Sequence, residues 1–599
     1  MSALNQYGME IEARTVEPSP VTRLSEEIEH TVADAIRRSF PDVHDPDALV
    51  RGSDHADFQS NAALPLAAAT KQRSRDIADA LAGELAPDSM LADVQVAGPG
   101  FLNLTLTGDA IWRQVEARLE APELGLSRPA ADTVTVIDYS SPNVAKQMHV
   151  GHLRSTVIGD TLARLTACLG AQVVRQNHVG DWGTQFGMLI QYLDEHPGSG
   201  WDATGDAENN IARLDALYRD ARNEFDTDDA FAQRSRDRVV ALQNGDEETT
   251  RVWRTLVDVS ADAFQTLYDR LGIGLDRSDI AGESTYNPLL DDVVRELVDA
   301  GVAVESDGAL CVFFDEITGP SGDPVVLIVR KKDGGYGYAA TDLATLRYRV
   351  RDLHANEILY VVDARQSLHF RLIFETAARM GWVDDTVSPR HIAFGTVLGA
   401  DGTPFKTRAG DTVPLASLLD DAVQGARAVV ATKNPDLEAA ELDSIARAAG
   451  IGAVKYAELS TARNTDYRFD VAKMVALQGN TGVYLQYAYT RTAAVLDKAD
   501  HASGRIDDTL ALEPAERALA LHLDGYESAL RDAWQTHEPH RLASYLYSLA
   551  KLFSAFYENC PILPSAPALR ANRLQLTRLT QRTLRHGLDL LGIDVLDRM

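Results

Sequence analysis

Two histidines and a lysine in one short segment have the types and spacing to stabilise charge on a phosphoryl group. The segment SPNVAKQMHVGH runs from Ser141 to His152. His149 and His152 share one face of a first helical turn, where free N–H groups and the positive dipole favour anions. Gly151 keeps the backbone open to a ligand, and Lys146 adds a positive charge nearby. Such groups suit phosphoryl or nucleotidyl transfer without a covalent catalyst.

The same histidines could instead be surface residues or metal ligands. However, HxxH after a buried strand, with glycine in third place, is not the H-E-x-x-H zinc pattern. The cysteines, Cys168, Cys311 and Cys560, form no CxxC pair, so neither a zinc site of usual spacing nor a disulfide framework is supported. We therefore predict a phosphate-binding turn and no tightly bound metal.

The residues around this segment predict the βαβ unit that positions it. TVTVIDYS, starting at Thr133, is a near-continuous apolar run of strand length, typical of a sheet buried on both faces. After the loop SPNVAKQM, HVGHLRSTVIGDTLARLTACLG has apolar residues at helical spacing, and Gly170 suits a helix C-cap. AQVVRQNHVG is then a second strand, which predicts a parallel sheet.

The rest of the chain predicts further elements around this unit. A helical insertion is expected at about residues 195–275, and the pattern is helical from Leu415 to the end. Four segments are predicted to extend the parallel sheet: PVVLIVR (Pro324–Arg330), YGYAA (Tyr336–Ala340), EILYVVDA (Glu357–Ala364) and RHIAFGTVL (Arg390–Leu398). The predicted fold class is α/β; together with the resemblance described below, the domains are expected at 1–126 (α+β), 127–470 (a Rossmann-type parallel sheet) and 471–599 (all-α).

The chain is strongly acidic. Its 599 residues carry 58 Lys plus Arg and 88 Asp plus Glu, a formal net charge of −30, and only ten of the basic residues are Lys. Such a surface stays solvated where charge repulsion is screened to within about 3 Å at 1 M salt. We therefore expect a salt-rich cytoplasm and a halophilic archaeal source, with an ordinary acidic enzyme as the alternative. Net charge does not report a local patch, so a nucleic-acid partner is not excluded.

No segment of the sequence has the character of a membrane span or a signal peptide. No run of about 18 apolar residues occurs, and the N-terminal segment MSALNQYGMEIEART has no apolar core. We expect a soluble, cytoplasmic protein.

Longer blocks around the histidines resemble one enzyme family. HVGH resembles the HIGH signature of class I aminoacyl-tRNA synthetases, and its surroundings are similar to the arginyl-tRNA synthetase form. The similar blocks are DYSSPNVAKQMHVGHLRSTVIGD (Asp138–Asp160), NHVGDWGTQFG (Asn177–Gly187), YGYAATDLAT (Tyr336–Thr345), YVVDARQSLHF (Tyr360–Phe370) and the C-terminal helical region. The resemblance covers nearly the whole chain. It implies a ligase that activates L-arginine with Mg-ATP and transfers it to the 3′-terminal adenosine of tRNA(Arg).

The resemblance also assigns residues to the ATP site. PFKTRAGDTV (Pro404–Val413) resembles the family's divergent form of the second class I signature, KMSKS. Its Lys406 and Arg408 would neutralise departing pyrophosphate, unless the segment is an ordinary basic surface loop. In the family, a lysine just before HIGH compensates for the missing signature lysine, and Lys146 matches that lysine. The residues implied to contact ATP are Pro142, His149, Gly151, His152, Gly395 and Lys406.

A pocket for the guanidinium needs carboxylates and planar acceptors, because its rigid fork favours bidentate partners. The residues that match the family's arginine site are Asn143, Asn177, Tyr338, Asp342 and Gln366, and Glu283 is a second candidate carboxylate. Taken singly, each has a structural alternative: Asp342 could be a helix N-terminal carboxylate and Tyr338 a core residue.

Both end domains resemble tRNA-binding parts of the family. DFQSNAALPLA (Asp57–Ala67) and GPGFLNLTL (Gly98–Leu106) are similar to the domain that touches the tRNA elbow, and the C-terminal helices are similar to the anticodon-binding domain. Tyr484, Tyr487 and Met599 are the anticodon candidates. Tyr484, Tyr487 and Tyr489 cannot share one helix face, so at least one of them is expected in the core. There is no oligomer signal, which makes a monomer the default.

Two other classes of protein compete with this interpretation. A small-molecule nucleotidylyltransferase also uses an HxGH helix with ATP, but it has no need for some 130 C-terminal helical residues. An inactive tRNA-binding paralogue would have lost some of the histidines or pocket residues, whereas all of them are present here.

Overall fold

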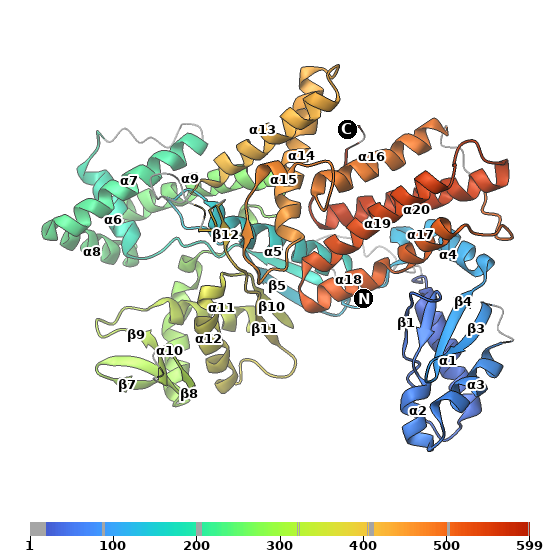
Figure 1. Cartoon of the computed structure of the whole chain (residues 1–599). Coiled ribbons are helices and arrows are strands. Elements are labelled where there is room, and N and C mark those ends of the chain that lie inside the picture. Colours follow the sequence, from blue (N-terminus) through green and yellow to red (C-terminus); the bar gives the residue numbers. More distant parts are fainter. Residues whose placement is uncertain are drawn as a thin grey trace, which may run out of the picture. The chain divides into compact units, whose positions relative to one another are not determined.

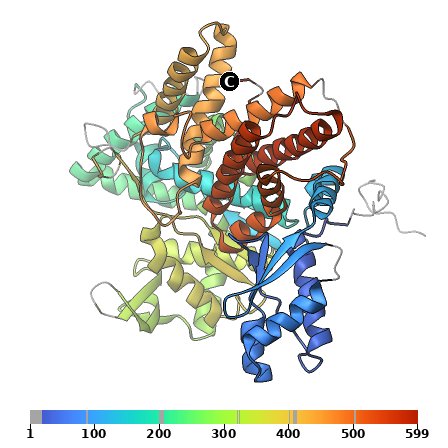
Figure 2. The same ribbon diagram turned by 45° about the vertical axis from the view of Figure 1, so that its right-hand side comes forward.

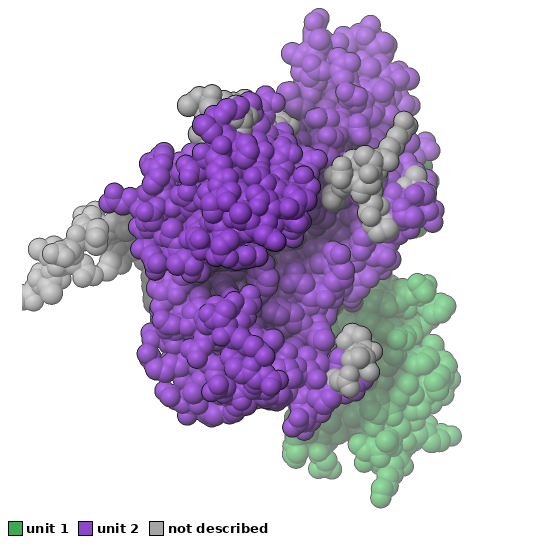
Figure 3. Space-filling model, turned by 90° about the vertical axis from the view of Figure 1, so that its left-hand side faces the viewer, with its two compact units in different colours: residues 1–127, 494–527, 551–583 green, residues 128–493, 528–550, 584–599 purple. Residues whose placement is uncertain are grey.

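The chain divides into two compact units, coloured green and purple in Figure 3. The computed structural model describes residues 19–86, 90–198, 207–319, 322, 324–399, 401–403, 405, 413–499, 504–596 and 598–599. Unit 1 contains residues 1–127, 494–527 and 551–583, and unit 2 contains 128–493, 528–550 and 584–599. In the described part of the chain, no helix is long and apolar enough to cross a membrane.

Unit 1 contains an antiparallel four-stranded sheet in the order β1-β2-β4-β3, against which α1 and α3 pack. These strands and helices are the blue elements of Figure 2. Its elements are α1 (Leu24–Ser39), β1 (Val50–Gly52), β2 (Phe58–Ser60), α2 (Ala63–Thr70), α3 (Ser74–Leu85), β3 (Leu91–Ala97), β4 (Phe101–Leu106), α4 (Gly108–Glu120), η1 (Pro122–Gly125) and α17 (Pro514–Asp524). Buried Asp524 connects α17 to α1 and α4 within this unit, because its carboxylate accepts hydrogen bonds from the N–H of Leu24 (2.9 Å) and from Nε2 of Gln114 (2.6 Å).

Unit 2 contains the predicted parallel sheet, in the order β11-β10-β5-β6 (Figure 1). The sheet and its neighbours are β5 (Val134–Asp138), α5 (Val150–Cys168), β6 (Gln172–Gln176), β10 (Glu357–Tyr360), η4 (Ala364–Gln366), α12 (Ser367–Arg379) and β11 (Ser388–His391). All three pairs of strands are parallel. After α5, Gly170 has a left-handed backbone with φ of 103°, which confirms the predicted turn from helix to strand.

A buried ion pair fixes the carboxyl ends of the two strands of the βαβ unit. Arg349, which is 0% exposed, donates from Nη2 to Asp138 (2.7 Å) at the end of β5 and from Nε to Gln176 (2.6 Å) at the end of β6. Its guanidinium also lies 4.9 Å from the ring centroid of Tyr360, at the end of β10. One side chain therefore ties three neighbouring strand ends together.

Between β6 and β10 the chain forms a helical insertion and a separate small sheet. These elements are α6 (Thr184–Glu195), α7 (Ala207–Thr227), α8 (Asp229–Gln243), α9 (Glu247–Leu271), η2 (Arg277–Asp279), η3 (Glu283–Leu289), α10 (Leu290–Asp299), β7 (Val304–Ser306), β8 (Ala309–Thr318), β9 (Pro324–Arg330) and α11 (Tyr338–Arg351). The predicted helical insertion is confirmed by α7, α8 and α9.

Two of the four segments predicted to extend the parallel sheet are assigned wrongly. Pro324–Arg330 is β9, which pairs antiparallel with β8 in the order β7-β8-β9. Its apolar run misled the prediction because Val326 and Ile328 face solvent, 41% and 49% exposed, whereas Leu327 and Val329 are buried. The segment Tyr336–Ala340 is not a strand either, because Gly337 caps α11 and the helix begins at Tyr338.

The chain after the parallel sheet is almost wholly helical, as predicted. The remaining elements are β12 (Val397–Leu398), α13 (Leu415–Lys433), α14 (Ala439–Leu459), β13 (Tyr467–Arg468), α15 (Val471–Met474), α16 (Gly482–Lys498), α18 (Tyr526–Thr536), α19 (Pro539–Asn559) and α20 (Pro567–Leu590). The last four are divided between the two units.

Candidate functional site

The candidate site lies at the carboxyl ends of β5 and β10, the central strands of the parallel sheet. From β5 the chain runs through α5 to β6 on one side, whereas β10 lies on the other side of β5 and leads to β11. Connections that diverge in this way leave a crevice where ligands bind in open α/β sheets. The loop with the two histidines follows β5. Gln366, exposed at the end of η4, follows β10.

The loop between β5 and α5 is held in a strained conformation. Ser140, Ser141 and Ala145 have left-handed backbones, with φ of 71°, 49° and 63°, which is unfavourable for residues with a side chain. The N–H of Ser141 donates to Oδ1 of Asn177 (3.0 Å), and the N–H of Ala145 donates to Oγ of Ser260 (2.9 Å). Strain that is held by buried partners in this way is typical of functional sites.

The two asparagines predicted to contact the amino acid differ in position. Asn177 is 0% exposed, and its amide also donates to the hydroxyl of Tyr268 (2.9 Å). This side chain has no surface for a ligand and instead supports the loop. Asn143 is exposed beside Gly180, where a Cβ on the glycine would lie 2.4 Å from Oδ1 of the asparagine.

His149 and His152 form a reciprocal cap at the N-terminus of α5. Nδ1 of His149 accepts from the N–H of Gly151 (3.0 Å), and Nδ1 of His152 accepts from the N–H of His149 (3.1 Å). A ring nitrogen that accepts carries no proton, so in each neutral imidazole the proton is on Nε2. The backbone thus leaves one Nε2–H donor on each ring, and the ring centroids are 4.0 Å apart.

Both imidazoles are neutral at physiological pH. Burial, together with the neighbouring His149, lowers the pKa of His152 to about 3. Burial and then Lys146 lower the pKa of His149, and Asp215 acts in the opposite direction. The pair therefore offers two neutral hydrogen-bond donors rather than two cations.

The glycine and proline candidates shape the backbone of the site. A Cβ at Gly151 would lie 2.8 Å from Cε1 of His149, so a larger residue would displace that ring. Pro142 is buried, and its carbonyl accepts from the N–H of Gly180 (3.1 Å). Gly395 follows β11, and a Cβ there would lie 2.5 Å from Oδ1 of Asp466.

Lys146 lies close to the two histidines and is covered by a residue of the insertion. Its Nζ is 4.3 Å from the ring centroid of Tyr218 on α7. Sequence reasoning missed Tyr218, because nothing in the pattern of α7 indicates which of its residues returns to the sheet.

The two residues of the second signature, Lys406 and Arg408, lie outside the described residues. The described chain resumes at Val413, whose carbonyl accepts from the N–H of Val150 (3.1 Å). Leu415 donates to the carbonyl of Met148 (2.9 Å). The segment that follows these two residues is therefore fixed directly to the HVGH turn.

Three predicted pocket residues come together beside this turn. Burial, then the charges of Asp181 and Asp342, raise the pKa of Glu283 to about 8. Partial burial and the neighbouring Glu283, Tyr218 and Asp342 raise the pKa of Tyr338, whereas the residue as a whole is 74% exposed. Within the described residues, the carboxylate of Glu283 has neither a hydrogen bond nor an ion pair. A partly buried acidic pocket in which, among the described residues, no Lys or Arg pairs with Glu283 or Asp342 suits a cationic ligand.

Two further residues that sequence reasoning missed support the pocket. Nε2 of His369 and Oδ2 of Asp342 are 2.5 Å apart, so the imidazole orients the carboxylate. Asp181 accepts from the N–H (2.8 Å) and hydroxyl (2.6 Å) of Ser284 and so fixes the start of η3. His369 could have been found as the titratable residue one turn after Gln366.

The anticodon candidates are on α16 and at the C-terminus. Tyr487 is 42% exposed, Tyr484 is half-buried against the ring of Tyr547, and Tyr489 is a core residue at 3%. This distribution confirms that at least one of the three tyrosines is in the core. Met599 packs partly buried against the cluster of Val430, Leu442, Ile445 and Leu596.

No group of three His, Cys, Asp or Glu side chains that could hold a metal ion occurs among the residues with described positions. Among the described residues, the polar groups of the crevice include the imidazoles of His149 and His152, the ammonium group of Lys146 and the carboxylates of Glu283 and Asp342. They suit a triphosphate and a cationic side chain.

Family models match three consecutive parts of the chain. The model "tRNA synthetases class I (R), catalytic domain" matches residues 115–471, "Arginyl tRNA synthetase N terminal domain" matches 24–106, and "DALR anticodon binding domain" matches 485–599.

Curated relatives and solved structures agree with these matches. An arginine–tRNA ligase of Frankia casuarinae is 58% identical over 97% of this chain and 99% of its own length. An arginine–tRNA ligase of Streptomyces avermitilis is 50% identical over 97% of this chain and 100% of its own length. The solved arginyl-tRNA synthetase of Thermus thermophilus has a TM-score of 0.79 at 26% identity, covering 96% of this chain and all of its own. That of Plasmodium falciparum has a TM-score of 0.78 at 28% identity, with coverages of 97% and 100%. The curated relatives named here are bacterial, so the expected halophilic archaeal source has no support.

Proposed function

The chain belongs to the class I arginyl-tRNA synthetases and is an arginine–tRNA ligase, and from this premise we propose which of its residues carry each part of the reaction. The observation that carries the proposal is that the two neutral Nε2–H donors follow β5, while the N–H of Glu283 bonds to the carbonyl of Val179 just after the neighbouring strand β6. In the first step the arginine carboxylate attacks the α-phosphorus of ATP, and the bond to pyrophosphate breaks. In the second, a ribose hydroxyl of the terminal tRNA adenosine takes the arginyl group and AMP leaves.

His149 and His152 stabilise the pentacoordinate α-phosphorus. Their Nε2–H groups donate to phosphate oxygens as negative charge develops there, with tautomers already fixed by the backbone. Neutral donors suit this role because they neither bind ATP as tight counterions nor lose their proton near pH 7. The open backbone at Gly151, with Pro142 and Gly395 shaping the floor, admits the nucleotide.

Positive charge for the triphosphate comes from Lys146. We assign Lys406 and Arg408 to the departing pyrophosphate, in keeping with the direct attachment of Val413 and Leu415 to the HVGH turn. Mg²⁺ enters with ATP as part of the substrate.

Glu283 and Asp342 hold the guanidinium of arginine. Asp342 is oriented by His369, and its second oxygen has no hydrogen-bond partner among the described residues. Exposed Tyr338 borders the carboxylates. Gln366 offers a planar amide at the end of η4, and we assign exposed Asn143 to the polar groups of the amino acid. The carboxylates of Glu283 and Asp342 are two acceptors that match the rigid fork of a guanidinium.

Arginine binding should release a proton from Glu283. With a pKa of about 8, this carboxyl is mostly protonated at pH 7 in the free enzyme, whereas a bound guanidinium favours the ionised form. Affinity for arginine should therefore rise with pH up to about 8 and level off above it, with about one proton released per arginine at pH 7. Calorimetric titration at pH 7 in two buffers of different ionisation enthalpy measures the number of protons.

The matched variant for this measurement is Glu283→Gln, which keeps the shape but cannot ionise. It should bind arginine more weakly and release no proton. Wild-type binding without proton release, or equal release from Glu283→Gln, would show that Glu283 is not in the guanidinium pocket.

We further propose how the rest of the chain meets tRNA. Residues 1–126 contact the tRNA elbow, 127–470 form the catalytic domain, and 471–599 bind the anticodon, with exposed Tyr487 and half-buried Tyr484 available to stack on bases at about 1–3 kcal/mol each. Met599 lies at the end of the same helical region. The active form is a monomer that acts in the cytoplasm.

Charging of total tRNA with each amino acid in turn tests the proposed assignments together with the activity. Arginine alone should be charged, and pyrophosphate exchange with and without tRNA then separates a tRNA-dependent first step from a tRNA-independent one. Charging of lysine without arginine would contradict the assigned pocket.

A further inference from the structure

Lys146 is held by an aromatic ring rather than by a carboxylate. Its Nζ lies 4.3 Å from the ring centroid of Tyr218. Among the residues with described side chains, no carboxylate comes within ion-pair distance of this ammonium group. A cation above the face of an aromatic ring is attracted by the ring quadrupole, so the ring can orient the ammonium group without neutralising it.

This kind of support suits a lysine that must meet a triphosphate. A carboxylate partner would cancel the charge and compete with phosphate oxygens for it. A free lysine, in contrast, has a flexible four-carbon stem and about 2 kcal/mol of rotamer entropy to lose when it is fixed. A ring beneath the ammonium group reduces that loss and leaves the charge available.

Tyr218 is itself fixed by the core of the insertion. Its ring packs against a buried cluster formed by Met188 of α6, Ala221 of α7 and Phe231 of α8. The ring is therefore a fixed platform rather than a mobile surface side chain.

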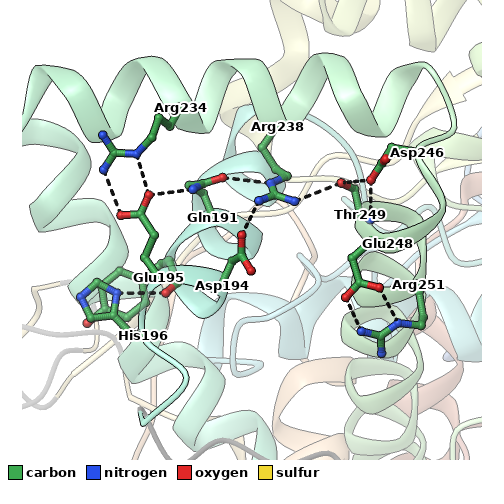
Figure 4. A network of polar contacts seen from close by, with 11 residues as sticks. Gln191, Asp194, Glu195, His196, Arg234, Arg238, Asp246, Glu248, Thr249 and Arg251 are labelled. Atoms are coloured by element: carbon green, nitrogen blue, oxygen red, sulfur yellow. Dashed lines mark hydrogen bonds and ion pairs between the residues drawn. The ribbon is translucent and has the colours of Figure 1, made fainter.

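A polar network holds the helices that carry this cluster (Figure 4). Glu195 of α6 accepts two hydrogen bonds from Arg234 of α8, at 2.6 Å and 2.9 Å. Arg238 of α8 donates to Gln191 (2.9 Å) and Asp194 (2.6 Å) of α6 and to Thr249 of α9 (3.3 Å). The network fixes α6, α8 and α9 relative to one another, and hence the cluster on which Tyr218 rests.

The same helix reaches both halves of the site. Asp215, one turn before Tyr218 on α7, is close enough to His149 for its negative charge to raise the pKa of that imidazole. Tyr218 itself contributes to the raised pKa of Tyr338, which borders the acidic pocket. α7 therefore brings Tyr218 into contact with Lys146 and carries residues that influence both halves of the site.

We propose that Tyr218 is a positioning residue of the adenylation site, whose ring holds the Lys146 ammonium group in place for the triphosphate. This inference rests on the role proposed above for Lys146. It makes the helical insertion a part of the active site rather than an appendage outside the sheet.

The test compares Tyr218→Leu, which removes the ring, with Tyr218→Phe, which retains it. In single-turnover arginine activation with saturating tRNA, Tyr218→Leu should lower the rate about 3- to 30-fold, the equivalent of one cation–π contact. Tyr218→Phe should stay within about twofold of the wild type, because the ring face remains. The KM for arginine should change little in both variants.

Three further variants separate positioning from loosening of the insertion. Tyr192→Leu removes a ring packed against the same cluster, and it should leave the rate unchanged. Pentafluorophenylalanine at position 218 keeps the shape of the ring but reverses the charge of its face, so it should slow activation as leucine does even if Tyr218→Leu folds poorly. In a Lys146→Ala background, Tyr218→Leu should cause no further loss.

The outcomes distinguish this inference from the proposed function. A wild-type rate for Lys146→Ala would overturn the role of Lys146 itself. A slow Lys146→Ala with a wild-type rate for Tyr218→Leu would overturn only the role of Tyr218. The role of Tyr218 would also be overturned if Tyr218→Phe or Tyr192→Leu were as slow as Tyr218→Leu. A further loss of rate when Tyr218→Leu is added to Lys146→Ala would overturn it as well.

Discussion

Replacing Asp342 by asparagine should raise the KM for arginine by about 100-fold or more and change the KM for ATP by only a few fold. Asparagine keeps the shape of the side chain, and its oxygen can still accept from His369, which lies 2.5 Å from Oδ2 of the aspartate. What it loses is the negative charge opposite the guanidinium, and loss of one partner of a buried charge pair costs about 2–5 kcal/mol. Steady-state charging with each substrate varied in turn measures both constants.

The control for this variant is Asp352→Asn, an exposed aspartate directly after α11. It should leave both constants unchanged. If Asp342→Asn raised the KM for arginine and the KM for ATP equally, Asp342 would be a structural residue of α11 rather than part of the arginine pocket.

Replacing His152 by asparagine should slow arginine activation by about 100- to 1,000-fold, the usual effect of removing one preorganised donor to a developing negative charge. The amide oxygen of asparagine can take the place of Nδ1 and accept from the N–H of His149, as the imidazole does now at 3.1 Å. The N-terminal cap is therefore kept and only the Nε2–H donor is lost. His152→Gln should recover part of the rate because its amide N–H reaches farther. Single-turnover activation and thermal unfolding of the same proteins separate lost chemistry from lost stability.

The pH dependence of the wild type provides a second check on the histidines. Burial and His149 lower the pKa of His152 to about 3, so this ring stays neutral as pH falls from 8 to 6. Activation should show no decline that depends on its protonation in this range. A decline centred near the ordinary histidine pKa of about 6.5 that vanishes in His152→Asn would mean that the imidazole is exposed and charged.

The phosphate half of the site could be predicted from the sequence because it is local. Strand, loop and helix follow one another directly around His149 and His152, and the helical spacing of the apolar residues places both rings on one turn. The tautomers could not be predicted, because they depend on the path of the backbone through Gly151 and on the hydrogen bonds at Nδ1.

The arginine half depends on contacts between distant segments. Composition and resemblance predict acidic residues at Glu283 and Asp342, but the pairing of Asp342 with His369 arises only when α11 packs beside α12. For Asn177, a match in the sequence did not reveal that the side chain is buried. It matches a family position in the sequence, yet its burial under the strained loop gives it a supporting role.

One of the two errors in the fold prediction has a simple physical cause. β9 is apolar enough to suggest a strand buried on both faces, although Val326 and Ile328 face solvent, and an apolar run alone cannot distinguish these cases. Tyr218 could not be predicted at all, because its position depends on how α6, α7 and α8 pack.

The most direct test is a structure of the protein with a non-hydrolysable analogue of arginyl-adenylate. The guanidinium should lie between the carboxylates of Glu283 and Asp342. Oxygens of the adenylate phosphate analogue should lie about 2.7–3.1 Å from Nε2 of His149 or His152. A guanidinium bound away from both carboxylates, or a phosphate group that neither ring contacts, would contradict the site described here.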